Sequence, residues 1–180
     1  QFDKSTGTIT DYTGNETGTL TIPSSIDGVT VTSIKAYALG SAKMKEVVIP
    51  NTIETLGFGV FQMCSSLEKV TFESGSKVTE LKDSMFYQCT KLKEVVFPEN
   101  LKSIKVLAFY KCTSLETITL PEGFTTLYNA AFLDCTNLKT VIVPDSLNHM
   151  VMNPFEGCTN LETLSVPYRC WQFGIVAAEW

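Results

Sequence analysis

The chain has 180 residues, of which 44% are hydrophobic, and a formal net charge of −5, which suits a single folded domain. It has no run of about eighteen apolar residues, so the sequence predicts no membrane-spanning helix. It also has no cluster of lysine and arginine with which to bind phosphates, so we expect no nucleic-acid partner. The first residue is Gln1, with no start methionine or signal region, and we expect that the natural N-terminus was removed by processing or truncation.

The N-terminal residues predict a hairpin. Two alternating runs, residues 7–12 and 18–23, flank a Gly- and Asn-rich stretch at 13–17, a pattern typical of two strands joined by a turn. The segment that follows is a repeated array, whose terminal units have to cover an open core. We therefore expect residues 1–33 to form an N-terminal β-hairpin cap and lead-in.

Residues 34–166 repeat one pattern. Five cysteines are separated by 25, 23, 23 and 23 residues: Cys64, Cys89, Cys112, Cys135 and Cys158. Three apolar columns keep the same step: Phe61, Phe86, Phe109, Phe132 and Phe155; Met44, Leu67, Leu92, Leu115, Leu138 and Leu161; and Val47, Val70, Val95, Ile118, Val141 and Leu164. In the first copy, Leu39 and Ala42 take the phenylalanine and cysteine places. A period of this size predicts a solenoid of stacked units.

The unit at residues 115–138 shows the expected elements of each copy. Its first six residues alternate around Ile118 and Leu120, which predicts a short strand. Pro121 ends the strand because it has no N–H to donate. The apolar residues of 124–132 follow at three- and four-residue steps, which predicts a helical or 3₁₀ turn.

One copy is longer than the others. The step from Val70 to Val95 is 25 residues, and the segment 73–77 with its central Gly75 replaces the proline. We expect these extra residues to form a surface loop that leaves the apolar columns undisturbed.

The repeated cysteines are interpreted as buried free thiols because they keep register with buried leucine and phenylalanine. A bridge between neighbours and metal ligation are the alternatives, although this spacing resembles no zinc pattern and His149 is the only histidine. Cys170 lies outside the register and could pair with Cys158. Residues 167–180 form an aromatic tail, either a C-terminal cap or a truncated repeat.

The repeat resembles the BspA-like bacterial leucine-rich repeat family. The matching phrase, at residues 131–144, is Ala-Phe-Leu-Asp-Cys-Thr-Asn-Leu-Lys-Thr-Val-Ile-Val-Pro, and the lead-in at residues 7–34 is similar too. The resemblance implies an α/β fold: a right-handed, curved leucine-rich repeat solenoid. Short parallel strands would line its concave face, and short helical, 3₁₀ or irregular returns its convex face. It also implies a secreted or cell-surface protein of host-associated bacteria, with adhesion and matrix-protein binding among the roles of such proteins.

In such a solenoid, equivalent residues of successive strands are lateral neighbours. One position alternates in charge through Lys45, Glu68, Lys93, Glu116, Lys139 and Glu162. This alternation could serve only to keep like charges apart, or it could form a neutral, mixed-sign platform for an extended protein partner. The candidate protein-binding residues on the concave face are Val48, Lys69, Thr71, Glu94, Val96, Thr117, Thr119, Thr140, Ile142 and Thr163.

The sequence does not favour catalysis. It contains no Ser-His-Asp order, Walker loop or dinucleotide glycine fingerprint, and single acids one repeat apart make a poor calcium cage. We therefore expect no enzyme activity, no cofactor and no metal site. The predicted function is recognition of an unidentified extracellular protein by a monomer that is secreted or at the cell surface. The alternative is a structural spacer that presents another domain.

Overall fold

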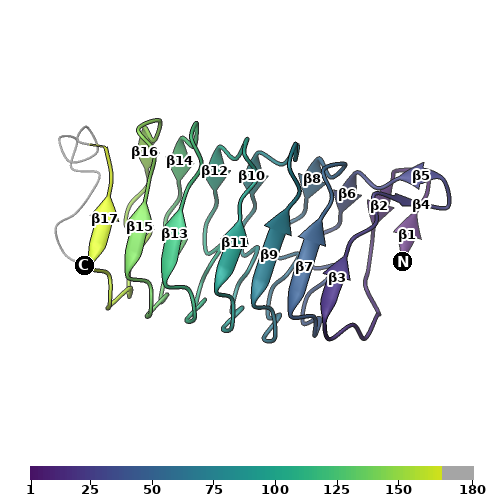
Figure 1. Ribbon diagram of the computed structural model, residues 1–180, viewed down its shortest axis with the longest axis horizontal. Coiled ribbons are helices and arrows are strands. Elements are labelled where there is room, and N and C mark those ends of the chain that lie inside the picture. Colours follow the sequence, from purple (N-terminus) through teal and green to yellow (C-terminus); the bar gives the residue numbers. More distant parts are fainter. Residues whose placement is uncertain (168–180) are drawn as a thin grey trace.

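The computed structural model describes residues 1–167, which form strands and turns but no helix. One strand from each copy lies in a first row (Figure 1), which comprises β3 (Thr19–Thr21), β7 (Glu46–Ile49), β9 (Lys69–Phe72), β11 (Glu94–Val96), β13 (Thr117–Thr119), β15 (Thr140–Ile142) and β17 (Thr163–Ser165). A second row comprises β2 (Thr8–Ile9), β6 (Ser33–Ile34), β8 (Thr55–Leu56), β10 (Glu80–Leu81), β12 (Ser103–Ile104), β14 (Thr126–Leu127) and β16 (His149–Met150). Hydrogen-bonded neighbours within each row are parallel.

The hydrophobic core lies between the two rows and is built from the repeated columns. The phenylalanine rings stack from copy to copy, with centroids 5.5 Å apart for Phe61 and Phe86 and 4.8 Å apart for Phe109 and Phe132. The leucine column from Leu67 to Leu138 is fully buried. Each unit therefore buries its apolar side chains mainly against its neighbours, as a solenoid requires.

The expected α/β class with helical returns is wrong, and the fold is an all-strand solenoid. Where a helical turn was predicted, residues 126–127 form β14. An α-helix needs each N–H to bond the carbonyl four residues earlier. Here the N–H of Phe109 instead donates to the carbonyl of Ala131 in the following copy, at 2.7 Å, and the N–H of Phe132 donates to Pro154 at 2.8 Å.

Left-handed residues explain why the returns cannot be helical. Two residues after each phenylalanine place the backbone has a positive φ, at Ser41, Met63, Gln88, Lys111, Asp134 and Gly157. The position two residues before the phenylalanine place also has a positive φ in five copies, at Tyr37, Gly59, Ser84, Leu107 and Ala130. A right-handed helix cannot pass through a left-handed residue. Each return therefore turns twice and sends its backbone hydrogen bonds to its neighbours.

The predicted hairpin between residues 7–12 and 18–23 is also wrong. β2 pairs in parallel with β6, and β3 pairs in parallel with β7, so the two runs lie in different rows. Both runs follow the pattern of the later copies, and they form a turn of the solenoid. The antiparallel pairs at this end are β1 (Phe2–Asp3) with β2, and β4 (Ser25–Ile26) with β5 (Val29–Thr30).

The longer copy forms the expected surface loop at residues 73–77. Val70, Phe72 and Val78 around it stay buried, so the core columns are undisturbed. The second row is interrupted at this copy, because β8 and β10 belong to separate sheets. Residues 168–180 of the predicted aromatic tail, with Cys170, lie outside the residues that the structure describes.

Candidate protein-binding face

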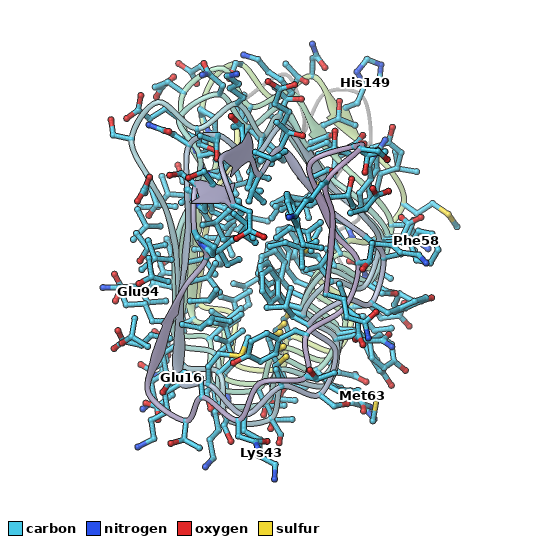
Figure 2. The ribbon with its side chains drawn as sticks, turned by 90° about the vertical axis from the view of Figure 1, so that its right-hand side faces the viewer. Glu16, Lys43, Phe58, Met63, Glu94 and His149 are labelled. Atoms are coloured by element: carbon cyan, nitrogen blue, oxygen red, sulfur yellow. The ribbon has the colours of Figure 1, made fainter. Side chains whose placement is uncertain are left out.

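The outward side of the first row, called the sheet face below, carries all ten predicted residues. Val48 lies opposite Thr71, which lies opposite Val96. Thr119 lies opposite Ile142, and Thr140 lies opposite Thr163. All ten side chains are exposed or half-buried, and Glu94 points outward from this side in Figure 2.

The sheet face has two halves. Five of the predicted residues are on β7, β9 and β11, and the other five are on β13, β15 and β17. Although β11 and β13 follow each other in the stack, they belong to different sheets, and Figure 1 shows a wider space between them than between β13 and β15. The apolar columns run through this division without a change of step. The outward position changes there, because it is charged at Glu46, Lys69 and Glu94 and is threonine at residues 117, 140 and 163.

Opposite charges pair within each half. Lys93 Nζ lies 2.8 Å from Glu68 Oε2, and Lys69 Nζ lies 2.9 Å from Glu94 Oε1. In the second half, Lys139 Nζ lies 3.1 Å from a carboxylate oxygen of Glu116. The hydrogen bond and the charge of Lys93 hold the pKa of the Glu68 carboxyl below its ordinary value. Both signs are thus present in each half: the charges of the first half balance, whereas the second half has Lys139 against Glu116 and Glu162.

A cavity of about 550 Å³ opens at the junction between the two halves. It is lined on one side by Lys93, Glu94 and Val95, and on the other by residues that include Glu116, Thr117 and Thr119. The opening also affects the core. Val95 and Phe97 are only partly buried, whereas their counterparts Val70 and Phe72 in β9 are buried.

The five repeated cysteines are buried free thiols, as predicted. They also have a role that the sequence did not indicate. Each Sγ donates to the carbonyl of the phenylalanine place one copy earlier: Cys64 to Leu39 at 3.1 Å, Cys89 to Phe61 at 3.0 Å, Cys112 to Phe86 at 3.1 Å, Cys135 to Phe109 at 3.0 Å and Cys158 to Phe132 at 3.2 Å. Burial raises the pKa of the Cys158 thiol to about 12 and that of Cys112 further. The thiols of Cys112 and Cys158 therefore stay protonated and unreactive at neutral pH.

The side of the molecule opposite the sheet face carries exposed apolar side chains that the sequence analysis did not single out. Phe58 and Met63 are each 49% exposed and lie far from Glu94 in Figure 2. Phe58 packs edge-on against Tyr37, with ring centroids 5.0 Å apart. Their exposure depends on the left-handed turns of the returns, for which the sequence gives no clear signal.

His149 is exposed at one end of the second row, where its Nδ1 lies 2.7 Å from Asn148 Oδ1. Within residues 1–167, no three acidic, cysteine or histidine side chains are grouped closely enough to hold a metal ion. No helix in this part of the chain could cross a membrane.

The most informative similarities are to bacterial leucine-rich repeat proteins of known structure. A leucine-rich repeat protein from Bacteroides ovatus is 30% identical with a TM-score of 0.73, over 87% of this chain and 39% of that one. A leucine-rich cell surface protein from Faecalibacterium prausnitzii is 26% identical with a TM-score of 0.74, over 89% of this chain and 50% of that one. The leucine-rich repeat protein of T. pallidum is 28% identical with a TM-score of 0.61, over 86% of this chain and 60% of that one.

The chain thus spans less than two thirds of the length of each of these proteins. None of the curated proteins matches it. The model of the BspA type leucine rich repeat region matches residues 3–99 and 32–162, in six copies. With these matches and the repeated columns of the core, the chain belongs to the BspA-type leucine-rich repeat family.

Proposed function

We propose that the protein is a recognition module that binds an extracellular protein through its sheet face, without catalysis. The observation that carries this proposal is the register of the sheet face, which brings ten outward residues from six strands onto one surface. The face carries both signs of charge with a small net charge, and it is rich in hydroxyl and β-branched side chains. Such a surface suits hydrogen bonds and shape matching with a protein better than attraction of a highly charged polymer.

The similar proteins support this function and its location. Repeat arrays of this family are typically non-catalytic and offer extended surfaces for binding. The similar protein of Faecalibacterium prausnitzii is described as a cell surface protein. We place this protein at the cell surface or outside the cell, as a monomer, and sedimentation that is independent of concentration is the expected behaviour.

A matched pair of double variants tests the sheet face. Val96 and Ile142 are exposed apolar residues of this face, at 41% and 43%. Phe58 and Met63 have similar exposure on the opposite side. The first variant carries Val96→Gln with Ile142→Gln, and the control carries Phe58→Gln with Met63→Gln.

Both variants and the unchanged chain are immobilised and exposed to host plasma and to matrix extracts. Proteins captured by the unchanged chain should be lost by the sheet-face variant and kept by the control. Loss in the control alone would transfer recognition to the opposite side and contradict the proposal. If neither variant alters capture, the alternative from the sequence, a structural spacer, becomes the better description.

A further inference from the structure

The backbone of the open junction between β11 and β13 has unpaired hydrogen-bonding groups on both sides. In a strand, the N–H and C=O of one residue point to one neighbouring strand, and those of the next residue point to the other. The N–H of Glu94 donates to the carbonyl of Glu68, just before β9, at 3.2 Å, so the backbone groups of Val95 point toward β13. The N–H of Leu120 donates to Ile142 at 3.0 Å, so the groups of Thr117 and Thr119 point toward β11.

These groups have no backbone partner within the described chain. At the next junctions the corresponding bonds are present, as from Thr140 to Glu116 at 3.2 Å and from Thr163 to Lys139 at 2.9 Å. No bond joins Thr117 to Lys93 among residues 1–167, because β11 and β13 are not paired. The ladder that runs along the sheet is therefore interrupted at one place, with a free edge on each side.

The opening is a wedge that is closed at the back. Behind it, β12 and β14 remain paired, with Ser103 opposite Thr126. The returns of the same two copies are also joined, by the N–H of Lys111 donating to Leu133 at 2.9 Å. The wedge is thus a local slot in a continuous stack, with about 550 Å³ of space at its mouth.

We infer that this slot takes an extended segment of a partner protein as an added strand between β11 and β13. This inference rests on the proposed function and gives its partner a specific chemistry. Two facing edges with alternating N–H and C=O groups match the backbone of an extended peptide, which carries both groups at the same spacing. The partly buried Val95 and Phe97 favour an apolar, β-branched residue at the inward position, with polar residues on either side of it.

The charges at the mouth of the slot fit the same kind of partner. Lys93 stands on one side, paired to Glu68, and Glu116 stands on the other, paired to Lys139. A strongly acidic or basic segment would be attracted by one wall and repelled by the other. The other interruption, between β8 and β10, is less suitable, because the ion pair of Lys77 with Glu54, at 2.6 Å, lies beside it.

Amide hydrogen exchange of the intact chain tests the slot first. The amides of Val95, Thr117 and Thr119 should exchange about tenfold or more faster than those of Glu94 and Thr140, which are bonded within the sheet. Equal protection of both groups would show that the slot is closed and would overturn the inference. Protection that rises with protein concentration, with a dimer in sedimentation, would overturn it by assigning the slot to a second copy.

The occupant is tested with short peptides selected from a random library on the immobilised chain. A synthetic copy of a selected peptide should slow the exchange of the slot amides by about tenfold or more. Thr119→Pro removes an N–H that has no partner in the protein, and it should weaken peptide binding by about tenfold. The matched variant Thr119→Val keeps this N–H and should weaken peptide binding clearly less than Thr119→Pro does.

The outcomes separate the slot from the sheet face. A peptide that binds without protecting the slot amides, or a library that yields no binder, overturns the slot. In either case, loss of plasma-protein capture by the Val96 and Ile142 variant would leave the proposed function standing. Should Thr119→Pro fail to fold, the exchange of the unchanged chain with and without peptide still decides the question.

Discussion

The thiol column makes a sharp prediction about stability, centred on Cys112. Its Sγ is fully buried and donates to the carbonyl of Phe86 at 3.1 Å. In Cys112→Ala, this carbonyl keeps the N–H of Cys89, which donates to it at 3.0 Å, but it loses the thiol, and a void the size of one sulfur atom is left. A net hydrogen bond contributes about 0.5–1.5 kcal/mol, and the lower half of that range applies because a thiol is a weak donor.

The void adds a smaller contribution to the same loss. At about 24 cal/mol per Å³, a cavity of about 20–25 Å³ costs about 0.5 kcal/mol. The two contributions together lower the free energy of unfolding by about 1–1.5 kcal/mol. For a chain of this length, the melting temperature should fall by about 2–6 °C.

Thermal and urea unfolding followed by circular dichroism, in reducing buffer, measures this loss. Cys112→Ser is the matched variant, because its hydroxyl can still donate to the Phe86 carbonyl. We expect serine to retain more stability than alanine. If alanine equals or exceeds serine, the thiol serves only as packing and the hydrogen-bond reasoning is refuted.

Three further results are expected. Met63 has φ 58°, a left-handed conformation that glycine adopts without strain. Met63→Gly should therefore raise the free energy of unfolding by about 0.5–1 kcal/mol, because the relief of strain exceeds the entropy cost of glycine. Met63→Ala, the control, should bring no gain in stability. The folded Cys158 thiol, with its pKa raised to about 12, stays protonated while the unfolded thiol ionises near pH 9, so stability should hold below about pH 9 and decline toward pH 12. The alkaline decline of the urea midpoint should be shallower in Cys158→Ser, and identical declines would contradict the assignment. Lys93→Glu removes the ion pair with Glu68 and places two acids side by side, so it should lower the melting temperature, and less so in high salt. Lys43→Glu, at an exposed position, is the control. An equal fall in both variants would show that the pairing is irrelevant.

The core could be predicted from the sequence because every copy buries the same positions. A column of identical apolar residues, such as Phe86, Phe109 and Phe132, indicates that each copy buries this position in the core. The structure stacks these rings as expected. The strands of the first row followed for the same reason, since their alternation is repeated in each unit. This repetition made the neighbours on the sheet face predictable as well.

The returns could not be predicted because their shape depends on residues with no turn signature. Left-handed places are occupied by Met63, Gln88 and Lys111, and only Gly59 and Gly157 would have suggested a positive φ. Apolar spacing at residues 124–132 therefore resembled a helix, although the backbone there bonds to adjacent copies. The slot was hidden for another reason. The change from Glu94 to Thr117 alters a side chain but not the step of the repeat, and only the three-dimensional structure shows that the backbone groups of Thr117 and Thr119 face open space.

The direction of the thiol bonds has a consequence for how such a protein can change in length. Every acceptor lies one unit upstream of its donor, so a loss of residues 113–135 would leave Cys158 next in line to the Phe109 carbonyl. Duplication of a whole unit would likewise supply one new donor with one new acceptor. Recombination in whole units therefore keeps every thiol paired with a carbonyl of the preceding unit, whereas a cut of any other size breaks the register of these bonds.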